Sequence, residues 1–430
     1  MSHLSLGLAG LGVVGAKTAE LLMSQADIWQ QKTGKKLTLT AVSARDRTKD
    51  RGIDLTGVDF EEDPVALAHR GDIDVVIELI GGSEGPARAL VEAALASGKH
   101  VVTANKALIA HHGQELAKLA EQHGAQLFFE AAVAGGIPAL KVLREGLAAN
   151  HISRVTGILN GTCNYILTEM TQTGRDFGDV LAEAQAKGFA EADPSFDVDG
   201  VDAAHKLAIL AALAYGEQID FSSVNISGIR SITGTDIAYA GELGYVIKLL
   251  GIAERSGIRS VQPCLIAHND QLAKIDGALN AVAFEAEPVQ TVLTTGPGAG
   301  AGPTSSAVLA DVLDLATGRG GLPFGRFVDT LGPSAHVPHD PEERRYYLRA
   351  MVPDRAGILS AITSILKDKD ISVESMLQRG QSEDAPVALV MTLHPARADA
   401  VLAACDVLTA SDFINGSVLA LPILDRIERH

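Results

Sequence analysis

Residues 4–15 read LSLGLAGLGVVG, an apolar run that leads directly into three glycines with the spacing G-x-G-x-x-G. The run is typical of a short buried strand, and residues 16–23 continue with a helical pattern. In this setting the first glycine permits a tight turn, the second lets a pyrophosphate approach the backbone, and the third lets the helix pack on the strand. The alternative is a tight turn that binds no ligand. The stretch predicts a Rossmann-like domain with cofactor contacts at Gly10, Gly12, Val13, Val14 and Gly15.

The size and composition favour an α/β protein of several domains. The chain has 430 residues, of which 47% are hydrophobic and only 4% aromatic, so its cores are aliphatic. A net charge of −17 argues against nucleic acid as a partner. Three widely spaced cysteines fit neither a disulfide framework nor a zinc site, which favours a reducing, cytoplasmic compartment. No apolar run reaches membrane-spanning length, so we expect no membrane association.

The cofactor domain is predicted to span residues 1–130. Four further segments have the length and apolar character of buried strands, at residues 37–43, 73–79, 100–103 and 126–129. No acidic residue stands at the tip of the second strand, and Arg45 follows instead, which favours NADP over NAD because arginine can bind a 2′-phosphate. The alternative for Arg45 is an ordinary charged loop. Lys106 follows the fourth strand and is predicted to face the ligand crevice.

A dense acidic stretch, GFAEADPSFDVDGVDAAHK at residues 188–206, ends in a helix that carries one lysine. Asp199 is predicted to cap this helix, and Lys206 falls on its apolar stripe. A lysine on that stripe loses hydration, and Asp202 lies one turn earlier, where a carboxylate can reach the ammonium. The alternatives to a functional pair are a surface ion pair and a metal loop.

Two glycine-rich stretches are predicted to lie near the ligands. Residues 130–138, EAAVAGGIP, combine one carboxylate with backbone carbonyls that small side chains leave uncovered. Such oxygen ligands suit a hard cation, and the alternative is a crowded crossover beneath a ligand. Residues 296–303, GPGAGAGP, precede a helix, and the segment near 300–330 is predicted to return to the cofactor domain with Gly300 close to the cofactor.

The remaining segments are predicted to form two further units. Residues 131–300 are expected to build an α+β unit on a second sheet, with a helix at 241–253. Residues 333–345 contain three prolines and mixed charges, which are typical of a linker. Residues 346–430 show the order strand, helix, strand, strand, helix, strand, which predicts a ferredoxin-like domain.

Together, these stretches resemble homoserine dehydrogenase carrying a C-terminal ACT regulatory domain, over essentially the whole chain. The resemblance rests on the segments at residues 7–15, 103–110, 130–138, 158–167, 191–206, 296–308 and 352–359. The stretch EADPSFDVDGVDAAHK at 191–206 is the specific one, since G-x-G-x-x-G is shared by many dehydrogenases. The resemblance implies an N-terminal Rossmann-like parallel sheet, an α+β catalytic and dimerisation domain with a mixed sheet, and a C-terminal ferredoxin-like ACT domain.

The resemblance also implies a reaction and its residues. The reaction is the reversible NAD(P)H-dependent reduction of L-aspartate 4-semialdehyde to L-homoserine, in the route to threonine and methionine. Lys206 would be the acid–base lysine, with Lys106 as a second lysine at the junction of cofactor and substrate. Asp202 would bond the substrate or position Lys206. Glu191 would bind the substrate's amino group, and Asp197 is a further candidate on the substrate side.

Further implications concern ions, effectors and assembly. The family pattern places a sodium ion near Glu130, bound mainly through backbone oxygens of Val133, Gly135 and Ile137. The ACT-like tail implies feedback by a pathway amino acid, with threonine as the expected effector, in a homo-oligomer (dimer or tetramer). Two other interpretations stay open: an acylating aldehyde dehydrogenase that uses Cys163 as its nucleophile, and a non-catalytic sensor of nucleotides and amino acids.

Overall fold

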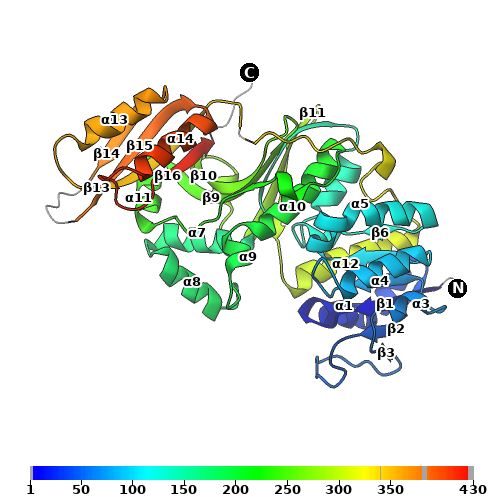
Figure 1. Cartoon of the computed structure of the whole chain (residues 1–430). Coiled ribbons are helices and arrows are strands. Elements are labelled where there is room, and N and C mark those ends of the chain that lie inside the picture. Colours follow the sequence, from blue (N-terminus) through cyan, green and yellow to red (C-terminus); the bar gives the residue numbers. More distant parts are fainter. Residues whose placement is uncertain (1–2, 339, 380–384, 425–430) are drawn as a thin grey trace.

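The N-terminal part of the chain forms one parallel sheet, at the blue and cyan end of Figure 1. The computed structural model describes residues 3–338, 340–379 and 385–424. The strands are β1 (His3–Ala9), β2 (Lys36–Ser43), β3 (Asp59–Glu61), β4 (Val75–Glu78), β5 (His100–Thr103) and β6 (Leu127–Phe128). They lie in the order β3-β2-β1-β4-β5-β6, and all neighbours pair in parallel. This is the strand order of doubly wound nucleotide-binding sheets, so the predicted fold class is confirmed for this part.

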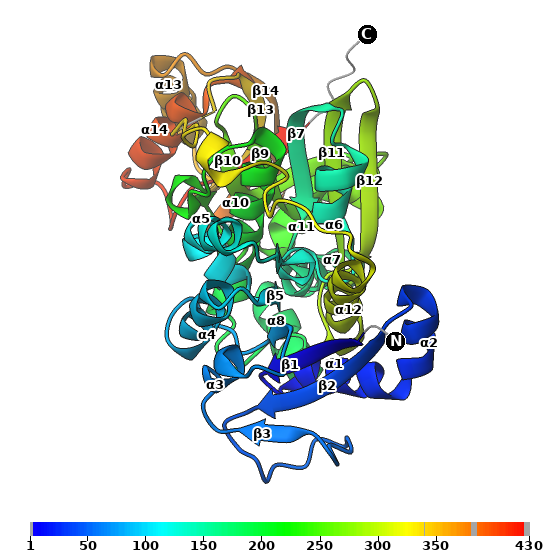
Figure 2. The same cartoon turned by 90° about the vertical axis from the view of Figure 1, so that its right-hand side faces the viewer.

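Helices connect these strands, and one helix returns from much later in the chain. The connecting helices are α1 (Val13–Ser24), α2 (Ala26–Thr33), α3 (Ala66–His69), α4 (Pro86–Ala96) and α5 (Lys106–His123). The returning helix α12 (Ala301–Thr317) packs against α1, as the two views in Figures 1 and 2 show. Ser305 Oγ on α12 donates to the carbonyl of Val14, 3.1 Å away. The second glycine-rich loop therefore ends beside the first glycine turn.

The middle of the chain builds a mixed sheet. Its strands are β7 (His151–Ile158), β8 (Asn225–Ile226), β9 (Tyr245–Glu254), β10 (Arg259–Ala267), β11 (Leu279–Glu287) and β12 (Gln290–Pro297). The helix predicted for residues 241–253 is wrong, because helix α11 (Gly234–Glu242) ends there and strand β9 follows. Residues 247–253 of β9 are all buried, and an apolar run buried on both faces has no alternation that distinguishes it from a buried helix.

Helices of this middle part pack on the sheet, and one of them is enclosed on all sides. They are α6 (Ala139–Lys141), α7 (Gly161–Thr173), α8 (Phe177–Ala186), α9 (Ser195–Val198) and α10 (Val201–Tyr215). Every residue of α10 after Val201 is buried, so this helix has no solvent face. It packs against β7, β9 and β10 below and against α5 of the nucleotide-binding part. Polar groups on α10 therefore lie between the two parts of the molecule.

The C-terminal part has the ferredoxin-like order, and its sheet continues the middle sheet. The elements are β13 (Arg344–Val352), α13 (Ile358–Asp368), β14 (Val373–Gln378), β15 (Val387–Ala396), α14 (Ala398–Thr409) and β16 (Leu419–Leu424). Strand β16 pairs with β13 on one side and in parallel with β10 on the other. His339 in the predicted linker, with residues 380–384 and 425–430 in the predicted C-terminal unit, lies outside the described residues.

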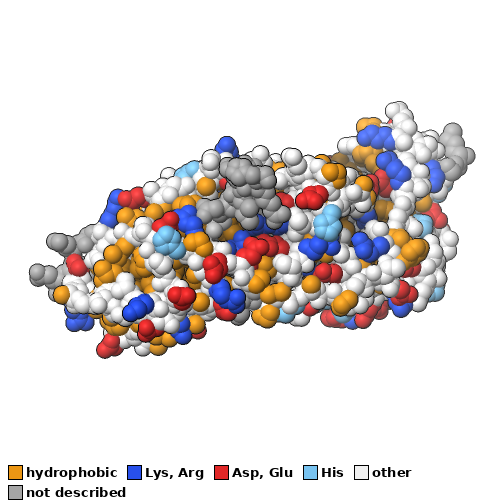
Figure 3. Space-filling model, turned by 90° about the horizontal axis from the view of Figure 1, so that it is seen from above, with side chains coloured by type: hydrophobic (Ala, Val, Ile, Leu, Met, Phe, Trp, Pro, Cys, Tyr) orange, Lys and Arg blue, Asp and Glu red, His pale blue; other side chains and the backbone are white. Residues whose placement is uncertain are grey.

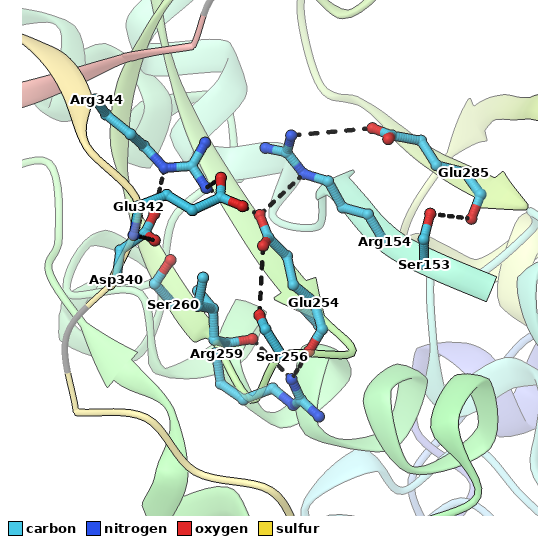
Figure 4. Close-up of polar contacts among 12 residues, drawn as sticks. Ser153, Arg154, Glu254, Ser256, Arg259, Ser260, Glu285, Asp340, Glu342 and Arg344 are labelled. Carbon is cyan, nitrogen blue, oxygen red and sulfur yellow. Dashed lines mark hydrogen bonds and ion pairs between the residues drawn. The ribbon is translucent and has the colours of Figure 1, made fainter. Parts of the chain in front are cut away.

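Buried polar contacts fix this junction. Asp236 on α11 is fully buried and accepts hydrogen bonds from Tyr347 Oη at 2.9 Å and Arg349 Nε at 2.7 Å. Figure 4 shows a second network, in which Arg344 of β13 pairs with Glu254 of β9 at 3.1 Å. Glu254 also pairs with Arg154 of β7 at 3.6 Å. The C-terminal unit is thus joined to the middle sheet by strand pairing and by charged groups.

The surface, the helices and the cysteines each add one observation. Seen from above in Figure 3, acidic and basic side chains are interspersed, and hydrophobic ones gather toward the C-terminal unit at the left. Within the described ranges, we find no helix that has both the length and the apolar character to cross a bilayer. Cys163, Cys264 and Cys405 are all free and buried.

Candidate active site

The centre of the site is a lysine on the buried helix α10. Lys206 is only 7% exposed, and its Nζ donates to the carbonyl of Leu159 at 2.7 Å and to Asp202 Oδ2 at 2.8 Å. Leu159 follows the end of β7, so the ammonium lies where that strand opens toward α7. The predicted i−4 contact between Asp202 and Lys206 is present and buried, and is not a surface pair.

A second lysine reaches the same carboxylate from the nucleotide-binding part. Lys106 is the first residue of α5, and its Nζ lies 3.1 Å from Asp202 Oδ1. Burial would raise the pKa of Asp202, but the two ammonium groups outweigh burial and hold that pKa well below its usual range. Asp202 is therefore an anion that bridges two lysines contributed by different helices, α5 of the nucleotide-binding part and α10. The side chain of Lys106 remains one-third exposed, at 33%, so this end of the group is open to solvent.

Asn160 joins two carboxylates of this group by hydrogen bonds and was not singled out from the sequence. Its Nδ2 donates to Asp202 Oδ2 and to Asp197 Oδ1, both at 2.8 Å, and its Oδ1 caps α7 by accepting from the backbone of Cys163. Burial raises the pKa of Asp197, although the hydrogen bond from Asn160 opposes this rise. The motif N-G-T after a strand indicates a helix cap, but only the folded chain shows that the same amide joins two carboxylates.

The other acids of the stretch have different environments. Glu191 is exposed in the loop before α9, and its backbone carbonyl accepts from Gln185 Nε2, so its carboxylate is not part of the buried group. Asp193 accepts from the backbone of Ser195, as expected for a turn residue. The predicted capping role of Asp199 is wrong: α10 begins after Gly200, without a side-chain cap, and Asp199 pairs with Arg230. Gly200 has φ +88°, a conformation that glycine adopts at low cost and that lets the chain turn into the helix.

Aromatic rings of His205, Phe221 and Phe196 lie beside the two lysines. His205 stacks on Phe221 with ring centroids 4.3 Å apart, and its Nε2 lies 3.2 Å from Nε2 of His111 on α5. Burial, reinforced by His111 and by Lys106, lowers the pKa of His205 to about 4. The imidazole is therefore neutral near pH 7 and adds no charge beside Lys206. Lys106 Nζ also lies 5.5 Å from the ring centroid of Phe196.

The structure contradicts a nucleophilic role for Cys163. Its side chain is fully buried in α7, and Sγ donates to the carbonyl of Asp197 at 3.2 Å. Burial raises the pKa of the thiol well above its ordinary value, and the nearby carboxylates add to this rise. A thiol that is neither ionised nor accessible cannot attack a carbonyl carbon, so the acylating aldehyde dehydrogenase interpretation is wrong.

The first glycine turn has the geometry that a pyrophosphate requires. Gly10 has φ +95°, and a Cβ atom there would lie 2.4 Å from the carbonyl oxygen of Leu79. A Cβ at Gly15 would lie 1.8 Å from the carbonyl oxygen of Gly10, so only glycine lets α1 approach the turn. Gly12 precedes α1, and no atom lies within 4 Å of the position of its missing Cβ. Val13 and Val14 are the first two residues of α1, and their backbone N–H groups can face phosphate oxygens.

The loop after β2 contains Arg45 and a second arginine that the sequence did not single out. Arg45 is exposed two residues beyond the end of β2. Arg51 folds back across the loop, donating through Nε to the carbonyl of Leu11 at 3.0 Å. This bond holds the loop against the glycine turn, next to the place where an adenosine ribose lies in nucleotide-binding sheets.

The second glycine loop lies beside residues 130–137. Gly300 precedes α12 with φ +107°, close to α1 through the Ser305 contact. A Cβ at Gly135 would lie 2.4 Å from the carbonyl oxygen of Gly298, and the Gly136 N–H donates to the carbonyl of Pro297. The two glycine-rich segments predicted to border the ligands therefore touch each other.

Glu130 is buried and uses both carboxylate oxygens within the protein. Oε1 and Oε2 accept from the backbone N–H groups of Leu140 and Lys141 at 3.0 and 2.9 Å. Burial, together with Asp311, raises the pKa of Glu130 to about 8. Among the backbone hydrogen bonds of the described residues, none ends on the buried carbonyls of Val133 or Gly135. The chemistry of this donor set fits a cation bound by backbone oxygens more closely than one bound by the carboxylate.

Comparisons with known proteins agree with this geometry. Residues 138–313 match the family model described as homoserine dehydrogenase, and residues 10–130 match its NAD-binding domain. Residues 346–403 match the ACT domain. Homoserine dehydrogenase of Neisseria gonorrhoeae is 40% identical over 450 residues, covering 100% of this chain and 97% of that relative. The Pseudomonas aeruginosa enzyme is also 40% identical, covering 98% of this chain and 99% of that relative.

Solved structures show the same similarity. A homoserine dehydrogenase from Thiobacillus denitrificans superposes with a TM-score of 0.91 at 41% identity, covering 99% of both chains. A hyperthermophilic archaeal homoserine dehydrogenase in complex with NADPH gives a TM-score of 0.65 at 27% identity and covers 75% of this chain. The similarity extends over the nucleotide-binding part, the middle part and the ACT domain. The chain therefore belongs to the homoserine dehydrogenase family, as an NAD(P)-dependent oxidoreductase with a C-terminal ACT regulatory domain.

Proposed function

We propose that Lys206 is the acid–base group in the reversible reduction of L-aspartate 4-semialdehyde to L-homoserine. The supporting observation is the group Lys106–Asp202–Lys206, in which Asp202 and Lys206 are buried, assembled where the nucleotide-binding part meets α10. NADPH or NADH, when bound, supplies the hydride. The aldehyde oxygen gains negative charge as its carbon is reduced, and an ammonium at Lys206 both stabilises this charge and delivers the proton.

Asp202 is proposed to set the position of both lysines. Its two oxygens bond one ammonium each, so neither lysine can turn away without leaving a buried carboxylate short of a partner. Asn160 provides the remaining hydrogen bond and fixes the carboxylate plane. Lys106, which is one-third exposed at the outer end of this group, would then orient the carbonyl of the substrate next to the nicotinamide.

Glu191 and Asp197 are proposed to bind the substrate's α-ammonium. Asp197 lies beside the Asp202 group through its shared partner Asn160. Glu191 is exposed and comes from a loop, so its contact would form when substrate is bound. The N–H groups at the start of α7 and the two lysines provide positive charge for the carboxylate and the aldehyde oxygen of the same molecule.

The cofactor is proposed to be NADP, with NAD as a poorer alternative. The exposed Arg45 and the position of Arg51 across the glycine turn support a 2′-phosphate site. A monovalent cation such as sodium is proposed near Glu130, held by carbonyl oxygens of Val133, Gly135 and Ile137, where it would brace the loop that touches Gly298.

Roles are proposed for the parts of the chain as follows. Residues 1–130 bind the nucleotide with help from the returning segment near 300–330, residues 131–300 bind substrate and mediate dimerisation, and residues 333–345 link them to the regulatory unit at 346–430. We infer threonine as the effector and a cytoplasmic homo-oligomer, a dimer or tetramer, as the assembly. The ACT match and the strand pairing between β16 and β10 support the regulatory role.

One assay tests the proposed reaction. The full-length protein should oxidise NADPH when L-aspartate 4-semialdehyde is added, and should reduce NADP when L-homoserine is added. Absence of both reactions would refute the proposed function and favour the sensor interpretation. Adding threonine to the same assay tests the effector: a rate that does not change with threonine would exclude it as an inhibitor.

A further inference from the structure

Asn280 is a buried side chain that no described residue pairs. It is the second residue of β11 and has no exposed surface. Neither Nδ2 nor Oδ1 bonds any described residue of the protein. Buried carboxamides are nearly always paired, because burial removes water and an unmade hydrogen bond destabilises the fold. Two unpaired atoms on one buried side chain therefore call for a function other than stabilising the fold.

Two glycines make room for this carboxamide. A Cβ atom at Gly298 would lie 2.1 Å from Asn280 Cγ, and one at Gly161 would lie 3.5 Å from Asn280 Oδ1. Gly298 belongs to the second glycine loop, and Gly161 is the first residue of α7. Asn280 is also the cross-strand neighbour of Gly296 at the other end of this loop. The carboxamide is thus enclosed between the glycine loop and the N-terminus of α7.

These neighbours connect Asn280 to both sides of the site. Gly161 follows Asn160, whose amide bonds Asp202. Gly298 lies two residues before Gly300, which precedes α12, the helix whose Ser305 contacts Val14 in the cofactor turn. Asn280 therefore lies between the segment that leads to the cofactor turn and the segment that bonds Asp202.

We propose that Asn280 is a positioning residue of the reaction, whose carboxamide bonds the backbone of the glycine loop at residues 296–300 when cofactor and substrate are bound. Peptide groups flanked by glycine can rotate without a side-chain clash, so the loop can turn a carbonyl and an N–H toward the carboxamide. This inference rests on the proposed function, since it names a residue that serves the same site.

Asn164 provides a matched control. It is also a buried asparagine, on α7, but its carboxamide is paired. Its Nδ2 donates to the carbonyls of Ile275, Gly277 and Leu279, and its Oδ1 accepts from Lys248. A fully bonded carboxamide stabilises the fold itself. Its replacement should lower the melting temperature and leave the kcat of the folded enzyme unchanged.

The test compares Asn280→Leu with Asn164→Leu in the full-length protein. For Asn280→Leu we expect a melting temperature equal to or above that of the wild type, because an apolar group replaces an unpaired amide. We expect its kcat/KM for the semialdehyde to fall by about tenfold or more, as the loss of one or two hydrogen bonds made only with ligands bound would produce. A lower melting temperature with wild-type kcat and KM would overturn the proposal and make Asn280 a structural residue.

A second measurement covers the case in which leucine does not fit. Hydrogen exchange of the backbone amides of Gly296, Gly298, Ala299 and Gly300 is followed with and without NADPH plus homoserine, a pair that cannot turn over. The wild type should show increased protection with both ligands, and Asn280→Ala should show at least a severalfold smaller increase. Equal protection in the two proteins would overturn the proposal. Wild-type inactivity would refute the proposed function instead, so the two failures are distinguishable.

Discussion

Replacement of Lys206 by methionine is the most direct test of the proposed chemistry. Methionine keeps much of the lysine stem in a position that is only 7% exposed, and removes the ammonium that bonds Leu159 and Asp202. Loss of a general acid typically lowers kcat by about 10² to 10⁴. A hundredfold loss corresponds to about 2.7 kcal/mol in the activation barrier. We therefore expect kcat to fall at least about a hundredfold in both directions of the reaction.

The same variant should remain folded, because Asp202 keeps partners. Lys106 and Asn160 still bond its carboxylate, so the cost in stability should fall below the roughly 3–5 kcal/mol of a fully broken buried pair. Thermal melting and NADPH binding, followed by fluorescence, check that the fold and the cofactor site survive. Both should stay close to wild type while turnover falls.

Lys206→Arg separates charge from proton transfer. Arginine keeps the positive charge but does not release a proton near neutral pH, so it can stabilise the developing oxyanion without protonating it. Its kcat should stay at least about tenfold below wild type. The reasoning would be refuted by a Lys206→Met variant that binds NADPH normally and turns over within about tenfold of the wild type.

Three further predictions concern the cofactor, acid stability and the domain junction. Arg45→Ala should raise KM for NADPH about tenfold or more and KM for NADH little, with Lys49→Ala as the control; equal effects on both cofactors would contradict a 2′-phosphate site. The pKa of His205, lowered to about 4 by burial, lies below the value of about 6.5 in the unfolded chain, so its contribution to stability is present above about pH 6.5 and is lost as the pH falls toward 4. Between about pH 7.5 and pH 5, the free energy of unfolding of the wild type should fall by roughly 2 kcal/mol more than that of His205→Gln. Parallel pH dependences of the unfolding free energy in the two proteins would exclude this contribution of His205. Arg349→Met should cost about 3 kcal/mol or more by leaving the buried Asp236 without its ion pair, yet spare kcat at 25 °C; an unchanged melting temperature would count against the assigned contact.

The local parts of the site could be predicted from the sequence. The glycine turn occupies six consecutive residues, and Asp202 and Lys206 are one helical turn apart, so spacing alone brings their groups together. Contacts between distant segments could not be predicted in this way. The bond from Asn160 to Asp202 spans 42 positions in the chain, and Lys106 reaches Asp202 from helix α5 of the nucleotide-binding part. These contacts depend on how α5, α7 and α10 pack, which periodicity does not specify.

Two predictions, the helix at β9 and the cap at Asp199, were wrong because the local sequence pattern did not contain the deciding information. Strand β9 was predicted as a helix because its buried residues show no alternation, and Asp199 was predicted as a cap because its position before an apolar helix fits one. In the fold, Gly200 makes the turn through a positive φ, and Asp199 is free to pair with Arg230. Tertiary contacts and backbone conformation decided both outcomes, and neither is visible in a window of a few residues.

The continuous sheet gives the ACT domain a direct structural connection to helix α10. Strand β16 pairs with β10, and both β10 and β9 pack against α10, the helix that carries Lys206. The Arg344–Glu254 pair holds the same junction (Figure 4), and so do the hydrogen bonds that Asp236 accepts from Tyr347 and Arg349. A ligand that favours a different position of the ACT domain must therefore either shift β10 or break these buried contacts. Because breaking a buried pair is costly, the lower-energy response is a movement transmitted through β10 to α10. Under the proposed role of Lys206, a small displacement of this residue would alter proton transfer.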